Sequence, residues 1–281
     1  MYRLNDNELL KYIEEDVPYL DLTTHLQDVK GKKAKLKIVT REELHISCME
    51  EACRIVELLN CKVESFIPSK KMAKKGDVLL EFSGDYNDVH KAWRCSQVLL
   101  EYTSKMSTYA HNMKKEIENV NKNCELLTTR KTFPFAKKLC IKAVMSGGAM
   151  PHRLNLGETI VFFDNHRVIY KTEHEFYENI KVFKIKVPEK KIVVESDNFE
   201  DAKELMKYGV DVLQLDKVSI ELLQNIVEYK NVNYPNVKIL ASGGIDINNA
   251  SKFGSTGVDG IVTSKPYTCG MANIGTKIEL I

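Results

Sequence analysis

The sequence lacks an excess of charge of either sign and lacks a long apolar run. Lysine and arginine together number 41, against 39 aspartate and glutamate residues, so the formal net charge is +2. This balance creates no field that would attract a nucleic acid or an anionic membrane surface. No apolar run approaches the ~20 residues that a helix needs to cross a bilayer. Both features argue against a nucleic-acid-binding or membrane-spanning protein.

Signals for secretion, disulfides and zinc are also missing. The opening residues, MYRLNDNELLKYIEED, are acidic and lack the apolar core of a signal peptide. The seven cysteines form no C-x-x-C pair and no paired spacing with histidines, and there is no H-E-x-x-H motif. We therefore expect a soluble, cytoplasmic protein with reduced, buried thiols.

Strand and helix patterns cover the whole chain, which at 281 residues suits one large domain or two modest ones. The first ~105 residues mix short strands (KLKIVT, DVLLEF) with helical stretches such as MEEACRIVELL. A long helix then follows, DVHKAWRCSQVLLEYTSKMSTYAHNMKKEIENV. The pattern predicts an α/β protein whose second part begins after this helix.

From Cys124 onward, apolar runs alternate regularly with segments of helical spacing. The predicted strands are CELLTT, TIVFF, KIVVE, DVLQL, VKILA and DGIVT. In the segments between them, apolar residues recur at helical intervals, as at Phe176, Ile180 and Phe183. Alternation of this kind favours a parallel sheet buried on both faces. Six strands fit either a barrel-like sheet short of eight strands or an open doubly wound sheet, and spacing does not separate the two.

A polar group follows each predicted strand, where parallel α/β proteins gather their reactive side chains. Glu195 and Asp216 come directly after apolar runs. A buried lone carboxylate is costly unless it meets a cation or a metal. Since Mg²⁺ prefers one or two carboxylates plus substrate oxygens, the pair suggests Mg²⁺ with a phosphorylated ligand. The loop ASGGI, with a helix expected to start at Asp246 or Ile247, is a candidate phosphate site.

Arginine is scarce, with 7 arginines among the 41 basic residues. Two of them, Arg130 and Arg153, lie in the two most polar strand-end clusters, next to Lys131 and His152 respectively. Arginine offers a rigid, bidentate fork for carboxylates that lysine cannot reproduce. We therefore expect these residues to bind an anionic ligand.

Several motifs together resemble the quinolinate phosphoribosyltransferases (nicotinate-nucleotide pyrophosphorylases). They are EEDVPYLDLTT, TTRKTFP, KAVMSGGAMPHR, FFDNH, VVES, LQLD, ASGGI and GVDGIVTS, in the order that the family shows. The resemblance implies an α/β, sandwich-like N-terminal domain over residues 1–107. It implies an incomplete TIM-like (β/α) barrel of about six parallel strands over residues 108–281, with a C-terminal tail that is a candidate to pack back on the N-terminal domain. It also implies a homodimer, in which one subunit's N-terminal domain covers the partner's barrel mouth.

The family's reaction joins a pyridine dicarboxylate to phosphoribosyl pyrophosphate (PRPP) with Mg²⁺, and releases pyrophosphate and carbon dioxide. Carried over by position, Arg130, His152 and Arg153 would hold the acceptor's carboxylates. Lys131 would act near both the acceptor and the phosphoribosyl group.

The resemblance also implies a donor side of the site. Glu195 and Asp216 would face the ribose and Mg²⁺ as catalytic and metal-binding residues. The 5′-phosphate site would be lined by small and hydroxyl-bearing residues, namely Ser242, Gly243, Gly244, Thr263 and Ser264.

Two departures from the family remove cations from the acceptor side. Gln97 stands where the family has an arginine that reaches into the partner's site, and Phe163 stands where it has a lysine. Each charge-assisted contact is worth roughly 1.5–3 kcal/mol. We therefore expect an acceptor with less negative charge than quinolinate, or with an apolar edge against Phe163. The pattern, with SGGAMPHRLNLGET and VTSKPY, resembles the family's ModD branch, named from its association with molybdate-transport genes.

Two other interpretations stay open. One is a non-catalytic protein that binds a phosphorylated metabolite or an oxyanion linked to molybdate supply, although paired carboxylates would repel an anion without Mg²⁺. The other is a Schiff-base aldolase on Lys131, Lys142 or Lys217, although a lysine-rich composition makes strand-end lysines common.

Overall fold

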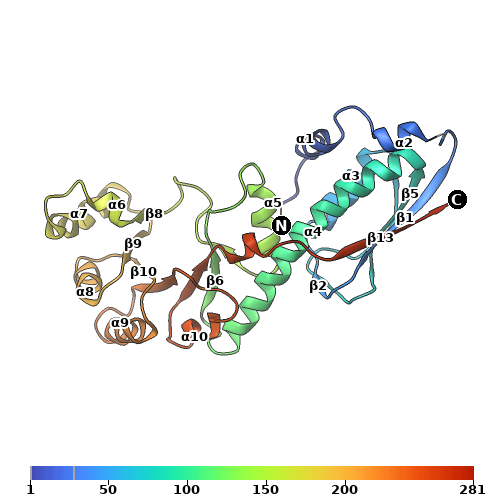
Figure 1. Cartoon of the computed structure of the whole chain (residues 1–281). Helices are drawn as coiled ribbons and strands as arrows, with labels where there is room; N and C mark the ends of the chain where they lie inside the picture. Colours follow the sequence, from blue (N-terminus) through green and yellow to red (C-terminus); the bar gives the residue numbers. More distant parts are fainter. Residues whose placement is uncertain (1, 28) are drawn as a thin grey trace. The chain divides into compact units, whose positions relative to one another are not determined.

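The computed structural model describes residues 2–27 and 29–281 and divides them into two units (Figure 1). The first unit comprises the segments up to His111, Thr132–Gly148 and Pro266–Ile281. The second comprises Asn112–Lys131 and Ala149–Lys265. This division gives the C-terminal segment and Thr132–Gly148 to the first unit, where the sequence suggested one cut at residue 107.

An antiparallel sheet forms the centre of the first unit. Its described strands run in the order β13 (Ile274–Leu280), β1 (Lys33–Thr40), β5 (Val78–Asp85) and β3 (Lys62–Phe66). The last strand of the chain pairs with β1, so that Ala34 lies opposite Leu280. A separate pair of short strands, β2 (Leu44–His45) and β4 (Met72–Ala73), completes the strands described in this unit.

Helices accompany this sheet in the first unit. They are α1 (Asp6–Asp16), α2 (Leu22–Leu26), α3 (Met49–Leu58) and α5 (Lys137–Ser146), and a 3₁₀ turn, η1 (Lys265–Thr268), precedes β13 in the chain. Among them, α3 contacts β3 and β5. The long helix α4 (Tyr86–Glu118) contributes its residues up to His111 to this unit. Buried apolar residues of strand and helix meet in one core, among them Leu36, Phe82, Ile55 and Leu100. The helices predicted from MEEACRIVELL and from the long segment after it are confirmed.

A parallel sheet forms the second unit. Its described strands run in the order β7 (Met150–Pro151), β6 (Glu125–Thr128), β12 (Gly260–Thr263), β11 (Lys238–Ser242), β10 (Val212–Asp216), β9 (Ile192–Ser196) and β8 (Ile160–Phe162). All its paired strands are parallel. The six predicted strands are confirmed, and the short β7 is added at one edge.

The strand order identifies this sheet as an incomplete barrel. Chain neighbours from β8 to β12 lie side by side, β12 then pairs with β6, and β6 pairs with β7. The only break in the cycle lies between β7 and β8, which form the two edges of the described sheet. A doubly wound sheet would reverse its order near the middle, whereas this cyclic order is that of a (β/α) barrel. The α/β fold with an incomplete barrel is therefore confirmed.

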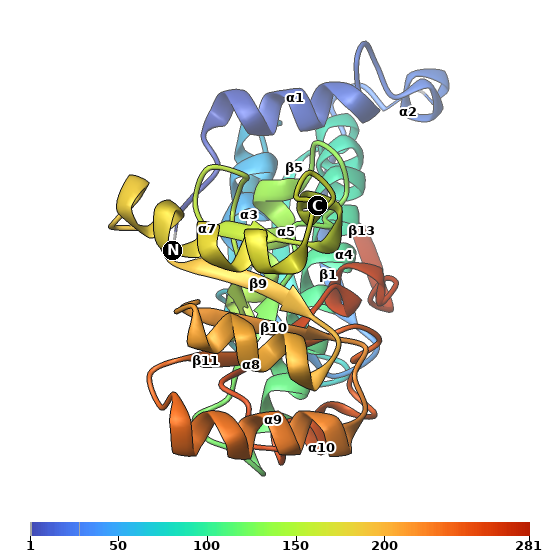
Figure 2. The same ribbon diagram turned by 90° about the vertical axis from the view of Figure 1, so that its left-hand side faces the viewer.

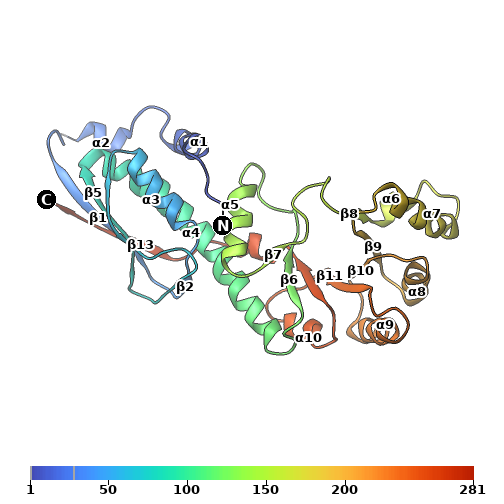
Figure 3. The ribbon, with the colours of Figure 1, turned by 180° about the vertical axis from the view of Figure 1, so that it is seen from behind.

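Helices cover the outer face of the barrel sheet. They are α6 (Asp164–Arg167), α7 (Glu173–Lys186), α8 (Phe199–Lys207), α9 (Ile220–Asn233) and α10 (Ala250–Gly254). Figures 2 and 3 show α8 and α9 side by side next to β9 and β10, and α8 contacts both strands and α9. The helix predicted to start at Asp246 or Ile247 is wrong in position. It begins at Ala250 because the Asp246 and Asn249 side chains accept backbone N–H groups and form a turn first.

The two faces of the barrel sheet differ in chemistry. Side chains that point alternately to the helix face are apolar and fully buried, as at Val194, Leu215, Ile239 and Ile261. The opposite face carries polar residues near the carboxyl ends of the strands. Packing therefore accounts for the first face and leaves the second face to be explained.

The remaining broad expectations concern thiols and membranes. Six cysteine thiols are buried, Cys269 is partly buried, and all seven are free. None of the helices in residues 2–27 and 29–281 combines the length and apolar character needed to cross a bilayer.

Candidate active site

Strand register brings four polar side chains together on the inner face of the barrel sheet. Gln214 lies opposite Glu195, and Asp216 lies opposite Ser242. Gln214 and Asp216 are two residues apart on β10, so they point to the same face. Gln214 Nε2 donates to Glu195 Oε2 at 2.8 Å, and Ser242 Oγ donates to Asp216 Oδ1 at 2.9 Å. Three adjacent strands thus hold two carboxylates in fixed positions.

The negative charge of Asp216 acts on the carboxylate of Glu195. Burial raises the pKa of Glu195 above its usual range, the hydrogen bond from Gln214 opposes this rise, and the charges of Asp216 and Asp164 add to it. Asp216 has a partner of its own, since Lys217 Nζ lies 3.1 Å from Asp216 Oδ2. The hydrogen bond to Asp216 raises the pKa of Lys217, so its ammonium stays charged. The face is therefore acidic, with one exposed cation beside it.

The loop after β11 approaches the end of β10 closely. Gly243 and Gly244 both have positive φ, at 88° and 70°. A Cβ on Gly243 would lie 2.7 Å from Asp216 Oδ1 and 2.4 Å from Lys217 Cγ, which only glycine avoids. A backbone without side chains is therefore exposed next to Glu195 and Asp216, called the acidic pair below, as a phosphate site requires.

Thr263 ends β12 and Ser264 follows it, and these two hydroxyl residues have different surroundings. Thr263 is buried, its hydroxyl donates to the Ile245 carbonyl at 2.8 Å, and it accepts the Lys265 amide at 3.1 Å. Its side chain therefore fastens the loop after β11, and its proton is not free for a phosphate. Ser264 is partly exposed at the carboxyl end of the sheet.

The predicted cations follow β6 and β7 at the same edge of the sheet. Arg130 and Lys131 are exposed after β6, whereas His152 and Arg153 are half-buried after β7. Burial lowers the pKa of Arg153, and the charge of Arg130 lowers it further, so the two guanidinium groups are electrostatic neighbours. Burial also lowers the pKa of His152, as does the charge of Arg153. His152 is therefore neutral at pH 7 and adds no fixed charge.

Phe163 joins this cluster from the opposite edge of the sheet. The Arg153 guanidinium lies 5.9 Å from the centre of the Phe163 ring, and its Nη1 donates to the Thr159 carbonyl at 3.4 Å. Arg153 follows β7 and Phe163 follows β8, so their contact spans the gap between the two edges of the sheet at the carboxyl end. Phe163 in turn stacks on His166, whose Nδ1 accepts the Phe163 amide at 3.0 Å.

These contacts form a series of neighbours along the carboxyl edge of the barrel sheet. The charge of Arg130 lowers the pKa of Arg153, and the Arg153 guanidinium contacts the Phe163 ring. Phe163 directly precedes Asp164 in the chain. The negative charges of Asp164 and Asp216 both raise the pKa of Glu195. Cations and an aromatic ring therefore line one side of the mouth, and carboxylates with a glycine loop line the other.

Comparison with known proteins identifies the family. Residues 21–104 match the family description "quinolinate phosphoribosyl transferase, N-terminal domain", and residues 106–270 match its C-terminal domain. The chain belongs to the quinolinate phosphoribosyl transferase family.

Relatives within the family agree with the predicted branch. The ModD protein of Pasteurella multocida is 26% identical over 279 residues, which is 99% of each chain, and that of Rhodobacter capsulatus is 29% identical over 251 residues, 89% of this chain and 96% of that one. A nicotinate-nucleotide pyrophosphorylase from Francisella tularensis superposes with a TM-score of 0.88 at 20% identity, over 99% of this chain and 98% of that one. A NadC deletion mutant superposes with a TM-score of 0.90 at 21% identity, over the whole of both chains. The resemblance to the ModD branch is confirmed, and the solved structures share the fold.

The family implies Mg²⁺, and the acidic pair fits that ion in one way. No group of three or more His, Cys, Asp and Glu side chains suited to a metal occurs in the described part of the chain. Mg²⁺ keeps several waters and binds through one or two carboxylates plus substrate phosphates. Glu195 and Asp216, whose mutual repulsion a cation would relieve, can therefore hold Mg²⁺ together with a phosphorylated substrate.

Gln97 lies on α4 in the first unit, whereas the other predicted site residues belong to the second unit. It is 8% exposed, and its amide hydrogens are donated to Glu101 Oε1 at 2.7 Å and to the Ile274 carbonyl at 3.3 Å. Trp93 Nε1 donates to its oxygen. The side chain therefore joins α4 to β13, and its place at the acceptor stays a prediction.

The structure adds residues that the motifs did not reveal. Gln214 orients Glu195, as described above. Arg167 on α6 is buried, with Nη1 and Nη2 at 3.0 and 3.2 Å from the two carboxylate oxygens of Asp201. Its Nη2 also donates to the Glu195 carbonyl at 3.3 Å. Arg167 thus ties the segment that carries Phe163 and Asp164 to the strand that carries Glu195.

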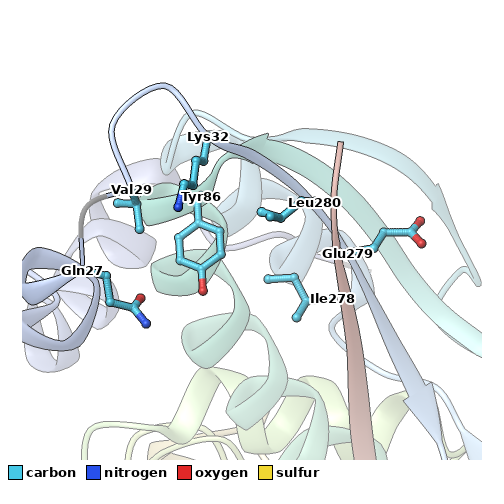
Figure 4. Close-up of a pocket in the computed structure, with 7 residues that line it drawn as sticks. All are labelled: Gln27, Val29, Lys32, Tyr86, Ile278, Glu279 and Leu280. Carbon is cyan, nitrogen blue, oxygen red and sulfur yellow. The ribbon is translucent and has the colours of Figure 1, made fainter.

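Two features of the first unit are excluded from the site. Lys142 is 3% exposed and forms a buried ion pair with Glu51, so its amine is not available to a carbonyl substrate. A pocket of about 330 Å³ is lined by Gln27, Val29, Lys32, Tyr86, Ile278, Glu279 and Leu280 (Figure 4). Glu279 points away from the other six side chains, so the pocket gathers no acid–base pair.

Proposed function

We propose that this chain is a phosphoribosyltransferase of the nicotinate-nucleotide pyrophosphorylase type. It transfers phosphoribose from PRPP to an anionic nitrogen heterocycle and releases pyrophosphate. The observation that supports this most strongly is the fixed acidic pair, Glu195 with Gln214 and Asp216 with Ser242, at the same carboxyl edge of the barrel sheet as two neighbouring arginines.

The donor side would supply the stabilisation that the reaction needs. Departure of pyrophosphate leaves positive charge on the ribose ring, as in glycoside chemistry. Two preorganised carboxylates, Glu195 and Asp216, stabilise that charge without moving. Ser242, Gly243 and Gly244 bind the 5′-phosphate through backbone N–H groups, and Ser264 binds it through its hydroxyl. Mg²⁺, when bound by the acidic pair, neutralises charge on the diphosphate leaving group.

The acceptor side would orient the nucleophilic nitrogen. Arg130, Lys131 and Arg153 bind the acceptor's carboxylate and hold its nitrogen toward the anomeric carbon. The neutral His152 serves as a hydrogen-bonding partner only, and the Phe163 ring replaces a charge with an apolar wall. We infer an acceptor that carries one carboxylate and an apolar edge in place of a second carboxylate. Family membership also leads us to propose a cytoplasmic homodimer.

The alternatives are weaker on specific grounds. A non-catalytic anion sensor would place Glu195 and Asp216 where they repel the ligand. A Schiff-base lysine needs a lowered pKa, whereas the pKa of Lys217 is raised and Lys142 is buried in an ion pair.

An acceptor screen tests the proposal. The full chain is incubated with PRPP, Mg²⁺ and a panel of nitrogen heterocycles with one or two carboxylates, and pyrophosphate is measured. We expect acceptor-dependent release that is greater for monocarboxylates than for quinolinate, and that is lost in Asp216→Asn. PRPP binding without release for any acceptor would favour the sensor.

A further inference from the structure

Lys217 occupies a strained position directly after β10. Its φ is 56°, in the left-handed region that a long side chain rarely adopts. Its amide donates to the Ser242 carbonyl at 2.9 Å, and Gly243 leaves room for its Cγ. The end of β11 and the loop after it therefore hold Lys217 in this conformation. Backbone strain that the surroundings impose is a reason to look for a function.

The strained backbone brings the Lys217 side chain to its own neighbour. Successive side chains of an extended strand point to opposite faces, so a Lys217 that continued β10 would point away from Asp216. In the structure its Nζ lies 3.1 Å from Asp216 Oδ2, while Oδ1 is already bonded to Ser242. The left-handed turn thus supplies a cation to the acidic pair.

This contact is built to be reversible. The Lys217 side chain is 78% exposed, whereas that of Asp216 is 25% exposed. An exposed ammonium on a flexible side chain gains little free energy from one ion-pair partner, and it dissociates from that partner readily. The buried Arg167–Asp201 pair, with both side chains at most 11% exposed, lacks that freedom.

We propose that Lys217 is a built-in counter-ion of the acidic pair, which suppresses Mg²⁺ binding to the empty site and releases Asp216 when Mg²⁺ arrives with the diphosphate of PRPP. Ammonium and metal compete for Asp216 Oδ2, and the diphosphate offers the displaced ammonium a new anionic partner. Metal and donor then bind cooperatively, because each favours the state in which Lys217 has left Asp216. The donor part of this role rests on the proposed function.

Metal binding to the empty site tests the role without any turnover. Free Mn²⁺, a paramagnetic substitute for Mg²⁺, is measured by electron paramagnetic resonance in titrations of the full chain. Lys217→Met keeps the side-chain length without charge, and Lys217→Asn removes the charge with a residue that tolerates left-handed φ. Lys252→Met removes one charge from α10 as a matched control. We expect both Lys217 variants to bind Mn²⁺ about three- to tenfold more tightly than the wild type, and Lys252→Met to match the wild type.

Saturating PRPP should then raise Mn²⁺ affinity more in the wild type than in either Lys217 variant. Unchanged or weaker Mn²⁺ binding by both Lys217 variants would overturn the proposal, as would no detectable binding by either at millimolar metal. The outcome is separate from that of the acceptor screen. Tighter Mn²⁺ binding by the variants in a chain that never releases pyrophosphate would sustain the counter-ion and reject the transferase.

Discussion

The antiparallel and parallel sheets each carry polar residues on one face, but these residues meet different surroundings. On β1, Ala34, Leu36 and Ile38 are fully buried, while Lys35 and Lys37 point to the other face and approach Glu81 at 3.7 and 3.4 Å. Partly exposed ion pairs of this kind, with lysine stems free to move, contribute little to stability. The polar face of β10 instead forms hydrogen bonds with both neighbouring strands, from Gln214 to Glu195 on β9 and from Ser242 on β11 to Asp216.

The difference distinguishes a solvent-facing strand surface from a surface that can bind a ligand. Long charged side chains cover the outer face of β1 and keep their freedom in water. Glu195 and Asp216 are held by amide and hydroxyl donors at the carboxyl end of a parallel sheet, where loops can close around a ligand. Fixing two like charges side by side costs stability, so packing alone does not explain them.

The buried ion pair of the first unit gives the largest expected effect on stability. Lys142→Met would leave Glu51, which is 2% exposed, as an unpaired buried charge. We expect the free energy of unfolding to fall by about 3–5 kcal/mol, measured by urea denaturation. Lys138→Met, which removes the exposed partner of Glu8, should cost less than about 1 kcal/mol. Equal losses in the two variants would show that burial does not set the cost.

Substitutions of the acidic pair in the second unit should lower activity and leave the protein folded. Glu195→Gln and Asp216→Asn keep the shape of each side chain and remove the charge that the reaction needs. We expect each to lower pyrophosphate release at least tenfold, about 1.4 kcal/mol in the barrier, while urea denaturation shows a folded protein. Unchanged turnover in both variants would remove Glu195 and Asp216 from the mechanism and erase the distinction between the two sheets.

The acceptor side can be changed toward the family's pattern. Phe163→Lys would restore a cation next to Arg153, and we expect about a tenfold rise in nicotinate mononucleotide formed from quinolinate and PRPP. Adding Gln97→Arg should raise the yield further, by less than a second independent contact would, because Gln97 now binds Glu101 and Ile274. Phe163→Leu, which stays uncharged, is the matched control. A gain in that variant would mean that ring size, and not charge, limits quinolinate.

The sequence predicts the barrel strands well because strands buried on both faces must be continuous apolar runs. It does not predict β7, since Met150–Pro151 is too short to show a period, and its pairing depends on β6. Nor does it fix the start of α10, where the Asp246 and Asn249 side chains outcompete the first helical turn. The pairing of β13 with β1 joins opposite ends of the chain and leaves no local signal.

The residues of the candidate site differ in how clearly the sequence reveals them. Glu195 and Asp216 stand out because a carboxylate after an apolar run is costly unless it has a role. Gln214 had the same signal, a lone amide within DVLQL, and could have been found. Arg167 could not, because its partner Asp201 lies 34 residues further along the chain. Thr263 was expected to bind phosphate, but no motif reveals that its hydroxyl holds the Ile245 carbonyl.

The smallest expected effect concerns a buried histidine of the first unit. Burial lowers the pKa of His45 to about 4, helped by the charges of His111 and Lys70, while its Nδ1 lies 2.9 Å from Ser107 Oγ. Between pH 6.5 and about 4 the unfolded chain binds a proton here that the folded chain does not, so stability falls as the pH is lowered through this window. Between pH 7.5 and 5.5 we expect His45 to account for about 1 kcal/mol of lost unfolding free energy. His45→Gln should remove that part of the pH dependence, whereas His25→Gln, at an exposed position on α2, should retain it. An identical pH slope in the wild type and His45→Gln would mean that His45 titrates alike in the folded and unfolded chains.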